Sequence, residues 1–326
     1  MKPGNLDHRL CIAPMMDHTD RHFRYFLRLI SRHVMLYTEM ITTGAIVYGK
    51  QYHRLEFSEQ EHPLGLQLGG NDPEQLSRCA KLAEDMGYDE INLNIGCPSS
   101  RVKTGQFGAC LMAVPELVAD CVAAISTRIN IPVSVKTRTG IDDHDSYEHL
   151  HDFIKTVSAG GCRTFILHAR KAWLEGLSPK QNRDIPPLDY NRVYRLKADF
   201  PGLGIIINGG INSLGQSQQL LKHVDGVMIG RAACKDPYML AGADRLIFGS
   251  LLPAPTRTQI LEGFIDYTTQ QLRLGASLHQ MTRHILGLFQ GQPGARTWRR
   301  YLSENIFNKD SGIEVIADAL DMMRAA

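Results

Sequence analysis

Short apolar segments alternate with amphipathic segments eight times between residues 10 and 231, and this alternation constrains the fold more than any other feature. Strands that alternate with helices pair in parallel, because each helix returns the chain to the same end of the sheet. Eight such units over about 250 residues match a closed (β/α)8 barrel, the TIM barrel of the α/β class. The predicted strands are residues 10–15, 34–40, 64–70, 90–96, 132–138, 164–170, 204–210 and 225–231. The predicted helices are residues 22–31, 73–87, 115–129, 146–160, 189–200 and 213–224.

An open, doubly wound sheet is the alternative fold. It is disfavoured because no Gly-x-Gly-x-x-Gly motif follows the first predicted strand. The strand–helix pattern ends near residue 245, where a proline-marked segment at 251–258 is followed by helical patterns alone. We therefore expect a barrel domain over residues 1–248 and an all-helical C-terminal domain over residues 249–326.

The composition indicates a soluble globular protein, since 43% of the residues are hydrophobic and 21% are charged. The formal net charge of +2 is too small by itself to indicate a nucleic-acid partner. No apolar run reaches about 18 residues, so we expect no membrane partner. The seven cysteines are odd in number and include no Cys-x-x-Cys pair. This argues against a disulfide framework and a metal site, and it favours a reducing cytoplasmic location.

Polar residues and glycines stand at the end of nearly every predicted strand. Active sites of (β/α)8 barrels form at this carboxyl-terminal rim. A purely structural rim would carry Val, Ile and Leu, so the set as a whole indicates a binding site, although any single member could be an ordinary solvated strand end. The rim candidates are Pro14, Met15, Glu39, Gln67, Asn92, Asn94, Cys97, Lys136, Arg138, His168, Arg170, Asn208, Gly209, Gly210, Gly230 and Arg231.

The ends of the last two strands predict a phosphate site. Gly209, Gly210 and Gly230 would let backbone N–H groups approach a phosphate closely, and Arg231 would add charge-assisted hydrogen bonds. Loops after strands seven and eight of such barrels often bind phosphate. Two ordinary turns are the structural alternative.

Gln67, Lys136 and His168 form a polar set that suits a flavin ring. Lys136 could stabilise the anionic reduced ring, and Gln67 could bond its pyrimidine edge. Taken singly, His168 could instead be a satisfied core histidine and Lys136 the partner of a nearby acid. Zinc is disfavoured because no two His or Cys residues at the rim show ligand spacing.

Several motifs carry a resemblance to a known family. They include APMMDHTDRHFR, YTEMITTGA, LQLGG, DEINLNIGCPSSRV, VSVKTRTGIDD, INGGI and VMIGR. Over nearly its whole length the sequence resembles the tRNA-dihydrouridine synthases. The insert HARKAWLEGLSPKQNR and the tail GLFQGQPGARTWRRYLS are similar to the DusA subfamily in particular.

The resemblance implies an FMN-containing enzyme, with NADPH or NADH as reductant, that reduces the C5=C6 bond of uridine in the tRNA D loop. It implies positions 20 and 20a as targets, hydride transfer from flavin N5 to C6, a catalytic barrel and a tRNA-binding helical domain. No obligate protein partner is implied. The implied flavin contacts are Pro14, Met15, Gln67, Lys136, His168, Asn208, Gly209, Gly210, Gly230 and Arg231.

Cys97 is the predicted catalytic residue, because the reduction also needs a proton at C5. A free thiol has a pKa of about 8.5, so it is mostly protonated at neutral pH and can donate. Gly96 gives the chain freedom to turn at the strand end, and Pro98 restricts the backbone beside the thiol. Residues 99–108 are expected to form a mobile loop. The structural alternative is a small buried cysteine.

A uridine in the tRNA elbow must leave its stack to reach such a pocket, so we expect a basic surface beyond the rim. Arg296, Arg299 and Arg300 are spaced to share one helical face, and Trp298 between them could stack or simply pack. A solvated helix face is the alternative. The predicted RNA contacts are Asn94, Arg138, Arg170, Lys171, Lys180, Arg183, Arg296, Arg299 and Arg300, with Arg101 and Lys103 as further candidates.

Two other functions compete with this one. A flavin-dependent reductase of free pyrimidines or similar small molecules would share the barrel and the phosphate loops, but it would not need the helical domain. A non-catalytic RNA-binding protein with a relic barrel would bind no FMN.

Overall fold

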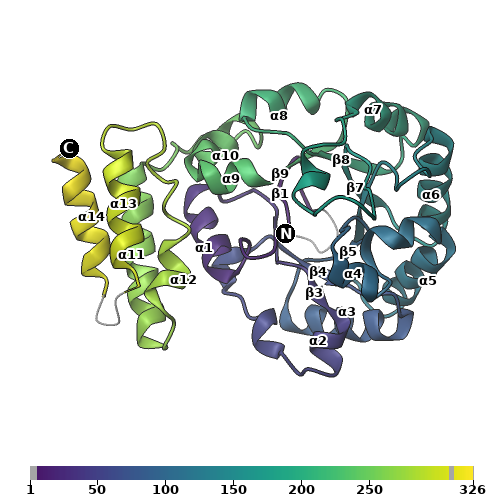
Figure 1. Cartoon of the computed structure of the whole chain (residues 1–326), viewed down its shortest axis with the longest axis horizontal. Helices are drawn as coiled ribbons and strands as arrows, with labels where there is room; N and C mark the ends of the chain where they lie inside the picture. The colour runs from purple at the N-terminus through teal and green to yellow at the C-terminus, as the bar shows by residue number, and fades with distance from the viewer. Residues whose placement is uncertain (1–5, 308–311, 326) are drawn as a thin grey trace.

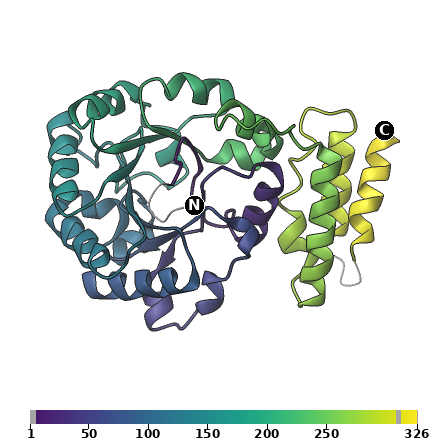
Figure 2. The same ribbon diagram turned by 180° about the vertical axis from the view of Figure 1, so that it is seen from behind.

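The computed structural model describes residues 6–307 and 312–325. Within them a parallel sheet closes into a barrel, surrounded by helices (Figures 1 and 2). Neighbouring strands follow the order β1-β9-β8-β7-β6-β5-β4-β2, with β3 also on β4. The circle closes between β1 and β2, where the Ile12 N–H donates to the Met35 carbonyl over 2.9 Å. The strands are β1 (Leu10–Ile12), β2 (Leu36–Tyr37), β3 (Ile41–Thr42), β4 (Leu64–Gly69), β5 (Glu90–Asn94), β6 (Val133–Arg138), β7 (Thr164–His168), β8 (Gly204–Asn208) and β9 (Gly226–Ile229).

The predicted barrel is confirmed, with one difference at the second strand. Residues 34–40 were expected to form one strand, but only β2 is regular there, and the short β3 follows it on the same neighbour. Thr38 explains part of the break, because its hydroxyl accepts the Gln67 N–H of β4 over 3.1 Å in place of a backbone carbonyl.

Each of the six predicted barrel helices is present. Asp20 begins α1 by accepting the Phe23 N–H, and Asp72 begins α3 with Pro73 in its first turn. The helices on and between the barrel units are α1 (Arg21–Ile30), α2 (Thr43–Val47), α3 (Pro73–Met86), α4 (Ser100–Thr104), α5 (Pro115–Ser126), α6 (Tyr147–Ala159), α7 (Tyr190–Asp199), α8 (Leu214–Leu220), α9 (Arg231–Lys235) and α10 (Ala243–Leu246). Short 3-10 helices cover Tyr52–Leu55, Glu59–Glu61, Gly108–Ala113, Gln181–Arg183 and Pro237–Gly242.

The segment at residues 99–108 differs from the expected loop, because α4 occupies half of it. Gly108 ends this segment with φ of +69°, and a Cβ there would lie 2.8 Å from the Cys97 carbonyl oxygen. Only glycine accommodates this conformation at so close an approach. The segment is therefore folded onto the end of β5.

The C-terminal part consists of α11 (Arg257–Arg273), α12 (Leu278–Thr282), α13 (Ala295–Asn305) and α14 (Glu314–Arg324). Of these, α11 and α12 lie beside α1 of the barrel, and α14 lies farthest from it (Figure 1). The predicted boundary at residues 248–249 falls in the connection between α10 and α11. Tyr25 stacks on Tyr267 with ring centres 3.9 Å apart, and His22 Nδ1 lies 2.7 Å from the Tyr267 hydroxyl. Asp20 pairs with both Arg283 and His284. The contact with the barrel is thus aromatic and ionic.

None of the helices in the described ranges is long and apolar enough to cross a bilayer.

Candidate active site at the carboxyl ends of the strands

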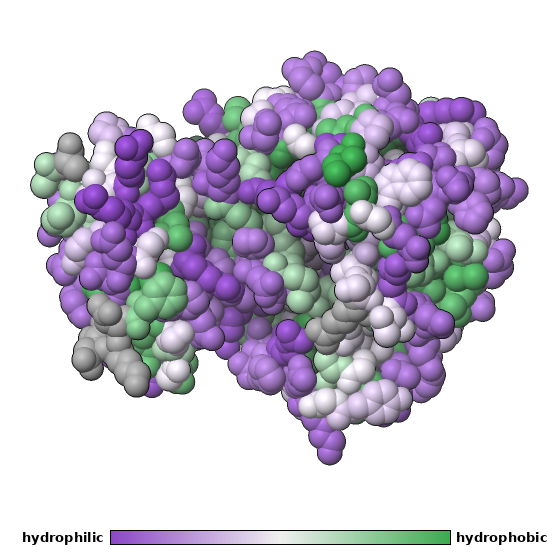
Figure 3. Space-filling view, viewed as in Figure 1, coloured by the Kyte–Doolittle hydropathy of each residue, from purple (hydrophilic) through white to green (hydrophobic). Residues whose placement is uncertain are grey.

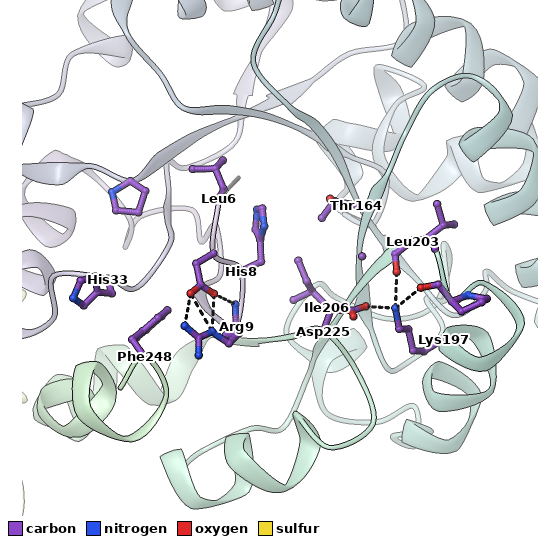
Figure 4. A pocket seen from close by; sticks show the side chains of 15 residues that line it. Leu6, His8, Arg9, His33, Thr164, Lys197, Leu203, Ile206, Asp225 and Phe248 are labelled. Carbon is purple, nitrogen blue, oxygen red and sulfur yellow. Dashed lines mark hydrogen bonds and ion pairs between the residues drawn. The ribbon is translucent and has the colours of Figure 1, made fainter. Parts of the chain in front are cut away.

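The strand register brings the predicted rim residues side by side. Asn94 of β5 pairs with Lys136 of β6, and Arg138 of β6 pairs with His168 of β7, which in turn pairs with Asn208 of β8. In parallel strands these ends meet at one edge of the barrel. A cavity of about 710 Å³ opens at the opposite edge, where β7 and β8 begin (Figure 4). It lies away from these residues and is not the candidate active site.

Cys97 is held by its backbone and leaves its thiol half-exposed. The Asn94 side-chain oxygen accepts the N–H groups of Cys97, over 3.0 Å, and of Gly96, over 3.2 Å. The Cys97 carbonyl accepts the Ala109 N–H over 3.0 Å. The sulfur lies 3.5 Å from the Ser99 hydroxyl, and its thiol is free. Cys97 is partly exposed, and the rest of it packs against the barrel core, so it is not fully buried as the structural alternative would have it. A partly exposed thiol on a backbone fixed at both ends is suited to a reaction at the rim.

Lys136 places a cation one strand away. Its ammonium donates to the Asn208 side-chain oxygen over 3.1 Å, and the Asn208 side-chain nitrogen donates to the Met228 carbonyl over 2.8 Å. Burial, with a smaller effect of the Arg138 charge, lowers the pKa of Lys136 to about 7. No carboxylate pairs with this ammonium among the described residues. Lys136 is therefore ready to meet a negative charge supplied by a ligand.

His168 has a buried ring nitrogen, Nδ1, without a hydrogen-bond partner among the described residues. Burial, helped by the charges of Arg138 and Lys136, lowers its pKa well below the ordinary value, so the ring is neutral at pH 7. A buried polar atom of this kind normally has a partner, which makes a bound ligand the direct explanation.

Gly209 and Gly210 follow β8 with φ of +115° and +70°. A Cβ on Gly209 would lie 3.3 Å from His168 Nε2, and one on Gly210 would lie 2.5 Å from a Leu188 methyl group. The Tyr190 hydroxyl donates to the Gly209 carbonyl over 2.6 Å. The turn is therefore available only to glycine, as a close backbone approach to a phosphate requires.

Arg231 lies exposed at the start of α9 and forms an ion pair with Asp184, with N and O 2.7 Å apart. Gly230 before it lies next to the end of β1, since a Cβ there would be in van der Waals contact with Ala13 Cβ and Met15 Sδ, both at 3.7 Å. Met15 is half-buried, and its N–H donates to the Thr19 hydroxyl over 3.0 Å. The first, eighth and ninth strands thus end around one glycine-lined opening.

The residues present fit a flavin nucleotide. Lys136 of β6 supplies a cation, and the neutral His168 ring of β7 supplies an unpaired polar nitrogen. The glycine turn after β8 supplies a backbone surface. Among the described residues no group of three or more His, Cys, Asp or Glu side chains could hold a metal.

Comparisons with known proteins agree with this geometry. Residues 11–324 match the family described as dihydrouridine synthase (Dus). The chain belongs to the dihydrouridine synthase family. It is 60% identical over 313 residues to the tRNA-dihydrouridine(20/20a) synthase of Vibrio parahaemolyticus, covering 96% of each chain. It is 59% identical over 316 residues to that of Escherichia coli K12, covering 97% of this chain and 91% of the relative. The family resemblance seen in the sequence and the assignment as an oxidoreductase are confirmed.

Two solved structures share the fold at low sequence identity. A morphinone reductase in complex with tetrahydroNAD matches with a TM-score of 0.52 at 12% identity, over 80% of this chain and 92% of the other. A 2-naphthoyl-CoA reductase matches with a TM-score of 0.56 at 12% identity, over 74% of this chain and 51% of the other. These likenesses support the barrel.

The residues predicted to contact RNA fall into different environments in this dihydrouridine synthase. Arg138 is buried, and its guanidinium donates to the carbonyls of Gly96 (2.9 Å), Lys171 (3.1 Å) and Asn182 (2.9 Å). It ties the Cys97 segment to the insert after β7, which favours a positioning role over direct RNA contact. Lys180 and Arg183 in the same insert are exposed.

The other cations of the insert have protein partners. Lys171 forms an ion pair with Asp145 over 2.7 Å and lies 4.1 Å from the Trp173 ring centre. Arg170 donates to the Pro186 carbonyl. Lys103 of α4 donates to the Leu174 carbonyl over 2.8 Å, which links α4 to the insert, while the side chain of Arg101 lies outside the described part.

On α13 the expected face is partly present. Arg296 and Arg300 are exposed, and Arg299 is half-buried, donating to the Gln290 side-chain oxygen over 3.0 Å. Trp298 is completely buried against Phe289, and its indole N–H donates to the Ile285 carbonyl over 3.1 Å. Of the two uses left open for Trp298, it packs, and the face available to RNA consists of arginines.

The sequence analysis missed a charged surface, the cleft between the barrel and the C-terminal helices. This cavity of about 520 Å³ lies where a recess separates the two parts in Figure 3. Its lining includes Thr38 and Glu39 after β2, so it adjoins the rim. The lining also holds the carboxylates of Asp20, Glu39 and Glu56, and Arg283 and Arg21 form ion pairs with Asp20 and Glu56. The basic residues in its lining are Arg21, His22, Arg24, His53, Arg54, His279 and Arg283. They come from three separate stretches of sequence, so no local pattern reveals the surface.

Proposed function

We propose that this protein is a tRNA-dihydrouridine synthase that uses FMN, with NADPH or NADH as reductant, to reduce uridines 20 and 20a of the tRNA D loop. The observation that carries the proposal is the half-exposed Cys97 thiol, held by Asn94 directly beside Lys136 and the glycine-lined opening. The names of the relatives support the substrate and its positions.

Reduction of the C5=C6 bond adds a hydride at C6 and a proton at C5, and a bound flavin would supply the hydride. Cys97 supplies the proton from its thiol: the S–H bond breaks as the C5–H bond forms, and the thiolate left behind regains a proton from water. A general acid of this kind contributes roughly a hundredfold to ten-thousandfold in rate. Asn94 holds the Cys97 backbone while this happens, so the sulfur keeps its place.

The flavin would be held by residues from most of the barrel strands. Lys136 and Gln67 face the ring, the neutral His168 ring donates or accepts one hydrogen bond, and the glycines with Arg231 receive the phosphate. For the phosphate to bind Arg231, the guanidinium shares its five donors between the phosphate and Asp184. Pro14, Met15 and Asn208 complete the wall.

Transfer RNA would bind across both parts of the chain, residues 1–248 carrying the catalytic site and residues 249–326 the RNA surface. The charged cleft adjoins the rim, and the exposed arginines of α13 extend the surface away from the barrel. Lys and Arg bind phosphates without regard to sequence, so this surface positions the tRNA while the pocket selects the uridine. An enzyme with this substrate and free cysteines works in the cytoplasm.

The test is Cys97→Ala, with Cys110→Ala as the matched control, since Cys110 is also half-exposed and free. Both variants should purify with bound FMN. Dihydrouridine formed on unmodified transcript, measured by nucleoside mass spectrometry, should fall at least a hundredfold in Cys97→Ala and remain near normal in Cys110→Ala. Unchanged turnover in Cys97→Ala would refute the proton-donor role. Rapid reoxidation of the reduced flavin by free uracil would favour the small-molecule reductase instead.

A further inference from the structure

Polar side chains form a continuous column through the interior of the barrel. Its lower end is Glu90, which is completely buried at the start of β5. His8 Nε2 lies 2.5 Å from one Glu90 oxygen, and the Tyr37 hydroxyl donates to the other over 2.9 Å. The Ser134 hydroxyl donates to that second oxygen as well. Burial lowers the pKa of His8, but the charge of Glu90 and the hydrogen bond to it, together with smaller contributions from Leu6 and Asp7, raise that pKa above its ordinary value.

From Ser134 the column continues upward through three amides. Asn92 Nδ2 donates to the Ser134 hydroxyl over 2.7 Å, and Gln67 Nε2 donates to Asn92 Oδ1 over 2.8 Å. Asn94 Nδ2 then donates to Gln67 Oε1 over 2.9 Å. The last link is Asn94 Oδ1, which accepts the Cys97 N–H. Six hydrogen bonds or ion pairs therefore join the His8 end of the barrel to the proposed proton donor.

The direction of hydrogen bonding along this column is determined by its ends. A carboxylate only accepts hydrogen bonds, so the Ser134 hydroxyl must donate its one proton to Glu90 and accept a hydrogen bond from Asn92. Asn92 must then present its oxygen to Gln67, and Gln67 its oxygen to Asn94. At the upper end a backbone N–H only donates, so Asn94 must present its oxygen to Cys97 and its nitrogen to Gln67. Both ends impose the same direction on all three amides, each of which could otherwise rotate by 180°.

The consequence lies at the ligand site. The side-chain amides of Gln67 and Asn94 each donate one N–H within the column and have a second N–H. The pyrimidine rings of both a flavin and a uridine carry carbonyl oxygens, which accept such donors. A reversed column would present carbonyl oxygens to those carbonyls, and the contact would be repulsive.

We propose that Glu90 is a positioning residue for the active site: from the far end of the barrel it orients the amides of Gln67 and Asn94 as donors toward the pyrimidine carbonyls of the ligands. This inference rests on the proposed function for the identity of the ligands. His8, at the Glu90 end of the column, lines the cavity of about 710 Å³ (Figure 4), so this end of the column lies on the side of the barrel opposite the reaction.

The test uses Glu90→Gln, which keeps the shape but can donate as well as accept, and Ser134→Ala, which removes one link and leaves the His8–Glu90 pair. The matched control is Asp89→Asn. Asp89 precedes Glu90, forms its own pair with His62 at 2.6 Å, and takes no part in the column. For each variant the FMN dissociation constant and the flavin absorption spectrum are measured at a temperature well below melting.

Both column variants should bind FMN about tenfold more weakly, with a shifted flavin absorption band, while Asp89→Asn binds FMN as the wild type does. A merely structural role would lower the melting temperature in all three variants without changing the affinity or spectrum of the folded protein. Affinities within twofold of wild type in both column variants overturn the proposal. The two hypotheses fail separately, because a wild-type protein that binds FMN but forms no dihydrouridine refutes the proposed function alone. A wild-type protein that binds no FMN refutes both.

Discussion

Lys136 offers the sharpest test of the electrostatics of the site. Its pKa of about 7 compares with 10.5 for an ordinary lysine. An anionic ring beside the ammonium would restore the ordinary value, and that gap corresponds to about 4 to 5 kcal/mol of favourable interaction. For a two-electron couple this is at most about 100 mV of reduction potential. Screening at a half-buried position reduces the effect, so we expect the Lys136→Met variant to lower the midpoint potential of bound FMN by about 50 mV.

The pH dependence of that potential has a definite sign. Above about pH 7 the Lys136 side chain is neutral in the oxidised protein, and reduction to an anionic ring draws a proton onto it. One further proton in a two-electron reduction makes the potential fall about 30 mV more steeply for each pH unit. The wild type should therefore show a steeper slope than Lys136→Met between pH 7.5 and about 9.5.

The assay is equilibrium reduction of the flavoprotein with a reference dye, followed by absorption at several pH values. Lys136→Arg is the control, because it keeps the charge while changing the shape. It should remain much closer to the wild type than Lys136→Met does. A Lys136→Met potential within about 10 mV of wild type, with the same pH slope, would refute the assignment of Lys136 to the ring.

Two further results are expected. Arg299→Glu should weaken tRNA binding and flatten its dependence on salt by about one phosphate contact. Arg324→Glu, the same charge change on α14, should have a smaller effect. If Arg299→Glu and the wild type bind tRNA equally well at several salt concentrations, α13 is excluded as the RNA surface. Burial lowers the pKa of His22 to about 4, so its contribution to stability is complete above about pH 6.5 and decreases as the pH falls toward 4, by about 3 kcal/mol in all. Melting temperatures at pH 7.5 and 4.5 measure this, and a drop equally large in His22→Gln would show that other groups cause it.

Much of the barrel could be predicted from the sequence, because its signals are local. Strand and helix periodicities need only neighbouring residues, and each strand end could be placed within a few positions of where the structure has it. Cys97, Lys136, His168 and Asn208 were identified in this way, and the register of β5 to β8 then makes them neighbours. A parallel barrel turns positions along the sequence into positions around one rim.

The environment of each side chain was not predictable by the same means. The signals that placed Arg138 among RNA contacts and left Trp298 open to stacking were composition and spacing, which carry no information about burial. In the structure Arg138 binds three carbonyls from two segments distant in sequence, and Trp298 is enclosed by a neighbouring helical turn. The 99–108 segment is partly helical, and Lys103 of that helix donates to the Leu174 carbonyl in the insert after β7, a contact that no local pattern predicts.

The sequence by itself determined the fold class and the chemistry available at the rim: which strands end in polar groups, where glycine permits tight turns, and which cysteine follows a strand. Only the tertiary structure decided which of those groups lack partners and which already form hydrogen bonds or ion pairs within the protein. His168 Nδ1 has no hydrogen-bond partner in the described part of the chain, Glu90 lies 82 residues from His8 yet binds it, and the basic residues of the charged cleft come from three separate segments. The reason is that hydrogen bonds, ion pairs and burial depend on distance in space, which chain folding sets and local sequence pattern does not record.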